Sequence, residues 1–89
     1  MVSLEECIGM SGLSEDEIGV IAEQEHVPPV VAAELASSLL NSPRGVLKLH
    51  GIFRDRLAAL AERRETQRER AISRLYAHFR TRYPMPRMI

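Results

Sequence analysis

Residues 43–82 read PRGVLKLHGIFRDRLAALAERRETQRERAISRLYAHFRTR, and this stretch decides the fold. Its apolar side chains recur with the helical period of about 3.6 residues, beginning with Val46, Leu49, Phe53, Leu57 and Leu60. The period stops over residues 62–70, which contain no apolar side chain, and resumes at Ala71. The stretch therefore forms either one long helix with a polar middle or two helices in succession.

The length of this stretch favours two helices over one. A single helix over residues 43–82 would extend roughly 60 Å, at about 1.5 Å per residue. A compact domain of this size has a radius of gyration of only about 12 Å. We therefore expect a break near residues 64–66, where Thr66 and Glu69 have the spacing of a capping box. The alternative is a long projecting helix whose far half is covered by a partner chain.

Upstream, capping residues and prolines mark further helices. Ser14 and Glu17 have capping-box spacing and predict a helix over residues 15–26. Pro28-Pro29 then breaks the chain and opens a helix running to Leu40. That helix is apolar over most of its circumference, which predicts a central position in the bundle.

The remaining signals complete an all-α fold. Ser3 predicts a short N-terminal helix, and Ser42-Pro43 begins the long stretch. We expect a small bundle of four to five helices, with a Pro-Pro helical hairpin and a long or broken C-terminal helix. Residues 1–82 form one helical domain in this interpretation, and residues 83–89 form a C-terminal tail.

Composition restricts the class of protein. The chain has 89 residues, of which 45% are hydrophobic and 27% charged, so we expect a single small domain. One cysteine, Cys7, excludes an internal disulfide and suits a reducing compartment. No apolar run approaches the roughly 18 residues of a membrane span, and the acidic start lacks the features of a secretory signal. We expect a cytoplasmic protein without a membrane partner.

The formal net charge of zero conceals two oppositely charged halves. Residues 1–42 carry eight acidic residues and no Lys or Arg, whereas residues 43–89 carry twelve basic and four acidic residues. One interpretation is that the two halves pack against each other within one domain, with ion pairs at the rim. The other is that one charged face recruits a partner or a second copy of the chain.

The arginines offer a nucleic-acid interpretation. In a continuous helix one face would carry Arg56, Arg63, Arg70 and Arg74, and an adjacent strip would carry Arg64, Arg68 and Arg82. Such a face could contact phosphates. Against this, acidic residues interleave with the arginines within residues 62–69, and no aromatic side chain is available there for base stacking. A solvated helix face is therefore the favoured interpretation.

One spacing of residues offers a metal-site interpretation. Glu23 and His26 form a Glu-x-x-His pair, as in di-iron helical bundles, and Glu34 on the next helix could supply a third ligand. The chain has no second matching set, so only an oligomer could complete a di-metal centre. We expect no cofactor, and no enzymatic activity, because the sequence also lacks a Gly-rich phosphate loop and an HExxH motif.

Partner binding remains the favoured function. Small helical domains often present an apolar groove to another helix, and the candidate interface residues are Ile52, Phe53 and Leu57. We expect a non-enzymatic protein–protein interaction or regulatory module that self-associates, as a dimer, or binds another protein. The alternatives are a nucleic-acid-associated protein and a metal-binding bundle.

One stretch carries a family resemblance. Residues 4–18, LEECIGMSGLSEDEI, followed by EHVP at 25–28 and VAAEL at 31–35, resemble short helical bacterial proteins of an uncharacterised family. The resemblance covers the first half of the chain. It implies a helical fold and carries no activity, cofactor or functional residue with it.

Overall fold

The computed structural model describes residues 12–86. Within this range the chain forms four α-helices and no strand, which confirms the all-α fold class. The helices are α2 (Glu15–Glu25), α3 (Pro29–Leu39), α4 (Pro43–Glu62) and α5 (Thr66–Arg82). The helix predicted from Ser3, together with Cys7, lies outside the described residues.

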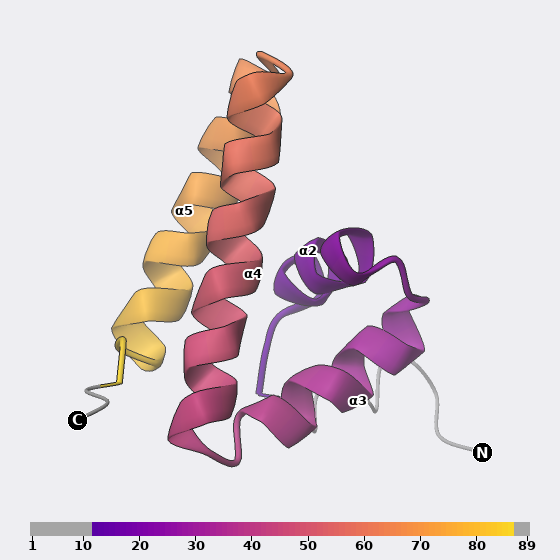
Figure 1. Ribbon diagram of the computed structural model, residues 1–89, viewed down its shortest axis with the longest axis vertical. Helices are drawn as coiled ribbons and strands as arrows, with labels where there is room; N and C mark the ends of the chain where they lie inside the picture. The colour runs from indigo at the N-terminus through magenta and orange to yellow at the C-terminus, as the bar shows by residue number, and fades with distance from the viewer. Residues whose placement is uncertain (1–11, 87–89) are drawn as a thin grey trace.

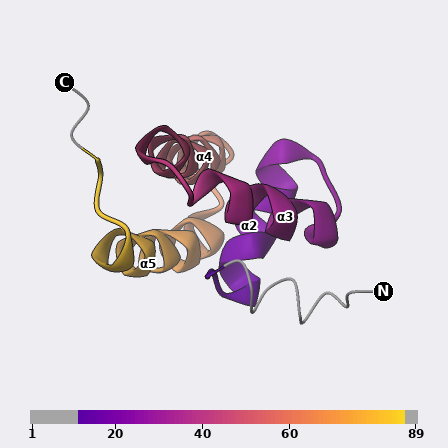
Figure 2. The same ribbon diagram turned by 90° about the horizontal axis from the view of Figure 1, so that it is seen from below.

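The helices α4 and α5 form an antiparallel hairpin, and α2 and α3 lie beside it (Figure 1). The turn of the hairpin rises beyond the level of α2 and α3. Seen from below, α4 and α5 run side by side, with α2 and α3 grouped against one side of the hairpin (Figure 2). The radius of gyration is 12.8 Å, so the chain folds back on itself as the length argument required.

The break between α4 and α5 falls at residues 63–65, confirming the preferred interpretation of this stretch. Arg64 adopts the left-handed conformation, with φ of 58°. Its N–H donates to the Ala61 carbonyl at 3.1 Å, and the N–H of Glu65 donates to the Leu60 carbonyl at 3.0 Å. These two bonds are those of a Schellman helix end, in which glycine is the usual left-handed residue.

The predicted capping box at the start of α5 is wrong. Thr66 is already the first helical residue, and the capping position is taken by Glu65, whose side chain makes no capping hydrogen bond. Since the Schellman bonds of α4 already determine the path of the chain through Arg64 and Glu65, the helix begins one residue earlier than a Thr66 cap would allow.

The capping box of α2 is confirmed. The Glu17 N–H donates to the Ser14 hydroxyl at 3.2 Å, and the Ser14 N–H donates to the Glu17 carboxylate at 2.8 Å. At the other end the helix stops at Glu25, because His26 turns to the left-handed conformation with φ of 56°. Val27 then donates from its N–H to the Ala22 carbonyl at 3.1 Å.

The connection from α3 to α4 is very tight. Ser42 caps α4 by accepting a hydrogen bond from the Gly45 N–H at 3.0 Å, and Pro43 occupies the first turn, as predicted. A Cβ atom on Gly45 would lie 1.8 Å from the carbonyl oxygen of Leu39. Only glycine therefore permits this approach of α4 to the end of α3.

The core lies between all four helices, with small side chains from α3 and larger ones from α2, α4 and α5. Its largest fully buried apolar side chains are Phe53, Phe79, Ile18, Ile21, Leu49 and Leu60. The rings of Phe53 and Phe79 stack with their centroids 5.1 Å apart. These side chains come from helices of both charged halves, so burial of apolar surface brings the halves together.

Helix α3 is peripheral, which corrects the prediction of a central helix. It buries one side made of small residues, Ala32, Ala33 and Ala36. On its other side Val30 and Val31 are 38% and 45% exposed. The apolar circumference of α3 is therefore partly an open surface of the molecule.

Candidate functional site: an open groove between α2 and α5

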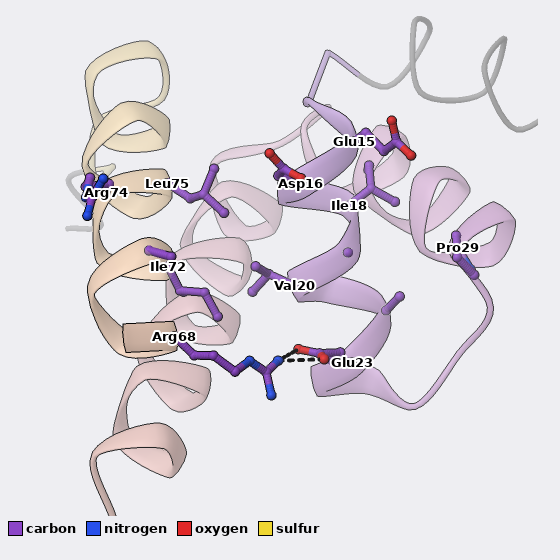
Figure 3. A pocket seen from close by; sticks show the side chains of 13 residues that line it. Glu15, Asp16, Ile18, Val20, Glu23, Pro29, Arg68, Ile72, Arg74 and Leu75 are labelled. Atoms are coloured by element: carbon purple, nitrogen blue, oxygen red, sulfur yellow. Dashed lines mark hydrogen bonds and ion pairs between the residues drawn. The ribbon is translucent and has the colours of Figure 1, made fainter. Parts of the chain in front are cut away.

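A groove of about 780 Å³ is lined by α2 and α5, together with Pro29 at the start of α3 (Figure 3). It lies there because α2 packs closely on α3 and α4 and contacts α5 much less. Figure 3 shows Val20 on α2 facing Ile72 on α5 across this space. We call it the α2/α5 groove; its apolar lining consists of Ile18, Gly19, Val20, Ala22, Pro29, Ala71, Ile72 and Leu75.

Charged side chains border the groove with opposite signs on its two sides. The α2 side carries Glu15, Asp16 and Glu23, and the α5 side carries Arg68 and Arg74. An apolar floor between an acidic and a basic border suits an amphipathic helix whose own charges are arranged in the opposite sense.

One end of the groove is spanned by an ion pair (Figure 3). The Arg68 guanidinium donates to both carboxylate oxygens of Glu23 at 2.7 Å. Arg56 approaches the same carboxylate at 3.6 Å and donates from Nε to Gln24 at 3.0 Å. Two arginines of the basic half are therefore held by one acidic residue of α2.

A second ion pair joins the ends of α2 and α5. Glu17 is almost fully buried, with 1% of its surface exposed, and both its carboxylate oxygens accept hydrogen bonds from Arg82. The same guanidinium donates to the Gly12 carbonyl at 3.1 Å. The acidic and basic halves thus pack against each other, as the first interpretation of the charge pattern predicted.

The arginines predicted to share one face are divided by the fold. Arg56 and Arg63 belong to α4 or its end, whereas Arg68, Arg70 and Arg74 belong to α5, which runs in the opposite direction. Arg56 and Arg68 are occupied by Glu23. Four of the predicted phosphate-contacting arginines remain exposed without an acidic partner among the described residues, namely Arg63, Arg64, Arg70 and Arg74.

The metal hypothesis finds no support in the described range. Glu23 is engaged by two arginines, while His26 and Glu34 are exposed on different segments. Within residues 12–86, no group of three or more His, Cys, Asp or Glu side chains is arranged to hold a metal ion. The Glu-x-x-His spacing is thus a feature of a helix end, with His26 ending α2.

The predicted apolar interface residues belong instead to the core. Phe53 is fully buried, Ile52 is 5% exposed, and Leu57 is partly buried against the same cluster. The surface that sequence reasoning missed is the α2/α5 groove. The apolar excess of α3 did indicate an uncovered surface on that helix, but which side stays open, with Val30 and Val31 exposed, depends on packing.

Sequence reasoning also missed a buried histidine network. His50 on α4 has no exposed surface. Its Nδ1 lies 3.0 Å from the Tyr76 hydroxyl, and its Nε2 lies 2.8 Å from the Tyr83 carbonyl. Since a carbonyl can only accept, Nε2 carries the proton and the Tyr76 hydroxyl donates to Nδ1.

The surroundings of His50 favour the neutral form of its ring. Burial lowers its pKa, and the positive charges of Arg80 and Arg54 lower the pKa further, although the bond to Tyr83 opposes this. The neutral ring ties α4 to α5 and to the first residue after α5. Among the described residues, His50 and Glu17 are the buried residues with polar or charged side chains, apart from Tyr76.

Comparison with known proteins returned no match to a protein-family model, a curated protein or a solved structure. In the described part of the chain, no helix combines the length and apolar character needed to cross a membrane.

Proposed function

We propose that this chain is a non-enzymatic helical interaction module that forms a dimer through the α2/α5 groove. The observation that carries the proposal is an apolar groove of about 780 Å³ that adjoins an exposed apolar stretch of α3. Pro29 lines the groove, and Val30 and Val31 follow it directly in the sequence. A groove and a protruding apolar surface on one molecule can satisfy each other in a two-fold pair.

In the proposed dimer, α3 of each copy lies in the groove of the other. Val30 and Val31 fill the apolar floor, and Glu34, the one charged residue of α3, faces Arg74 on the groove's basic border. Both residues are exposed and lack an ion-pair partner in the described range. Burial of apolar surface supplies the affinity, and this charge pair sets the orientation.

The test is the mass in solution measured by light scattering over a wide range of protein concentration. We expect a monomer–dimer equilibrium that Val31→Lys and Ala71→Arg shift toward monomer. Ala71 is exposed and lines the groove, so the larger side chain blocks the site without entering the core. A strictly monomeric wild type, or variants that dimerise normally, would contradict the proposal.

Matched controls separate the groove from general surface effects. Leu47 is 39% exposed on α4, close to the exposure of Val30, and lies outside the groove. Ala77 is exposed on the same helix as Ala71 and does not line the groove. We expect Leu47→Lys and Ala77→Arg to leave the mass unchanged.

A charge exchange tests the orientation. Glu34→Arg and Arg74→Glu alone should each weaken the dimer by placing like charges together, and the double variant should restore it. If both single variants weaken the dimer and the double variant does not restore it, Glu34 and Arg74 do not contact each other across the interface.

We propose nucleic-acid binding as the second candidate function. It is supported by the charge of the α4/α5 hairpin, where residues 43–82 contain eleven basic and four acidic residues. Phosphate contacts would come from the exposed Arg63, Arg64 and Arg70 near the turn of the hairpin. Binding to a single-stranded oligonucleotide should weaken steeply as salt rises and should be lost in a triple Arg→Gln variant of these positions. No binding at low salt would remove this candidate.

A further inference from the structure

A second pocket lies on the α4/α5 hairpin and shares no lining residue with the α2/α5 groove. Its volume is about 470 Å³, within the range of small-molecule sites. Arg54 comes from α4, Tyr76 and Arg80 come from α5, and Pro84 and Met85 follow α5. Neither the proposed dimer nor the nucleic-acid hypothesis uses these residues.

Two positive charges line this pocket, and the described residues supply no acidic side chain to offset them. No acidic side chain lines it, and neither Arg54 nor Arg80 has an ion-pair partner in the described part of the chain. The Arg80 guanidinium carbon lies 5.3 Å from the centre of the Tyr76 ring. This cation–π contact orients the side chain but leaves its charge unneutralised.

The buried His50, which is hydrogen-bonded to Tyr76 of the pocket, is affected by both arginines. Tyr76 joins the pocket to His50 through the 3.0 Å contact between its hydroxyl and Nδ1. Arg80 and Arg54 both lower the pKa of this buried ring, after the larger effect of burial. The positive charges of Arg54 on α4 and Arg80 on α5 therefore both act on the His50 ring.

We propose that this pocket binds the phosphate group of a small phosphorylated molecule between Arg54 and Arg80. Guanidinium groups bind phosphate oxygens in pairs of charge-assisted hydrogen bonds. The side chains of Pro84 and Met85, the latter 43% exposed, provide an apolar wall for the organic part of the ligand. A pocket closed on one side by this segment favours a small ligand over the continuous backbone of a nucleic acid.

The probe is pyrophosphate, which stays multiply charged through the acidic range in which His50 titrates. We expect pyrophosphate to bind at constant ionic strength and to raise the pKa of His50, because the bound anion offsets both arginines. Proton NMR of the His50 ring measures the pKa, and calorimetry measures the affinity. Arg54→Gln and Arg80→Gln should each weaken binding about tenfold or more and reduce the pyrophosphate-dependent pKa change.

The control is Arg70→Gln, which removes an exposed arginine of α5 outside the pocket and should leave both readouts unchanged. Thermal unfolding of each variant verifies that the fold is kept. The proposal is overturned if sodium chloride at equal ionic strength reproduces the change, or if all three variants bind equally. It is also overturned if a single-stranded oligonucleotide binds through Arg54 and Arg80 while pyrophosphate does not.

Discussion

At the scale of single residues, two buried polar side chains connect segments that are distant in sequence. Glu17 links α2 to Arg82 at the end of α5 and also caps its own helix through Ser14. His50 links α4 to Tyr76 and to the Tyr83 carbonyl. Both are fully hydrogen-bonded, as buried polar groups must be to avoid a large desolvation cost.

Replacing Glu17 with glutamine should destabilise the protein. The variant keeps the size of the side chain but removes the charge that Arg82 meets, and a hydrogen bond to a charged group contributes about 1.5–3 kcal/mol. Because Arg82 is 42% exposed, we expect a loss near the lower end, about 1–2 kcal/mol. Urea unfolding measures it. Glu15→Gln, in the exposed first turn, should change stability by less than about 0.5 kcal/mol; equal losses would contradict the role of the ion pair.

His50 should make stability depend on pH below neutrality. Because the pKa of His50 is lowered in the folded state from 6.5, the unfolded chain binds the proton first as pH falls. Stability is therefore fully present above pH 6.5 and decreases as pH falls from there toward the folded-state pKa, by at most about 1.4 kcal/mol per pH unit.

Unfolding free energies measured between neutral pH and the onset of carboxylate titration test this expectation. The His50→Gln variant should be less stable at neutral pH, but its unfolding free energy should no longer decrease as the pH falls below 6.5. His78→Gln, an exposed histidine of α5, should keep it. A slope that persists in His50→Gln would assign the pH dependence to another group.

At the scale of elements, the helix boundaries depend on a few backbone positions. The break after α4 rests on the left-handed Arg64, and the turn into α4 rests on the absence of a side chain at Gly45. Both connections are short, so small changes there affect how neighbouring helices pack.

Arg64→Gly should stabilise the hairpin by up to about 1 kcal/mol, because a left-handed backbone costs a residue with a Cβ atom about 1–2 kcal/mol. Arg63→Gly is the matched control, since Arg63 has φ of −83° and lies in the right-handed region. That change should destabilise by about 0.5–1 kcal/mol. Thermal melting compares the stability of the two variants. A loss of stability in both would argue against a left-handed conformation at Arg64.

Alanine substitutions at two glycines of α4 should change the stability of the protein in opposite directions. Gly45→Ala places a Cβ atom 1.8 Å from the Leu39 carbonyl oxygen, so we expect a loss of more than about 1 kcal/mol. Gly51→Ala meets nothing within 4 Å and should gain about 0.5–1 kcal/mol from helix propensity. Chemical denaturation of both variants checks the difference in sign.

At the scale of the whole molecule, charge and apolar burial have different roles. The described acidic segment, residues 12–42, and the basic hairpin are joined by a common core. The ion pairs between the acidic segment and the hairpin help to fix how the two are oriented relative to each other. The pair of Arg68 and Glu23 lies at the surface, with side chains 47% and 45% exposed, where such pairs contribute little.

A double-mutant cycle on Glu23→Gln and Arg68→Gln should therefore give a small coupling energy, about 0.2–1 kcal/mol. The coupling should decrease further when sodium chloride is added, because exposed charges are screened. Urea unfolding of the four proteins measures it. A coupling well above this range, insensitive to salt, would mean that surface charge contributes substantially to holding the halves together.

The sequence by itself determined the helical class, the start of α2 at Ser14 and the start of α4 at Ser42, and it favoured a break after α4. These features depend on local chemistry: a side-chain oxygen that caps an N–H group, a proline at a first turn, and an interrupted apolar period. The left-handed residues His26 and Arg64 were not predictable in the same way, because neither is glycine.

Only the tertiary structure decided which apolar side chains stay at the surface. Ile52 and Phe53 are buried, whereas Val30 and Val31 are exposed, although all four lie in helices with apolar faces. The reason is that burial depends on the distance between helices that are far apart in sequence. That packing, which no local pattern encodes, also gives the weak contact of α2 with α5, the groove that these helices line, and the pocket lined by both Arg54 and Arg80.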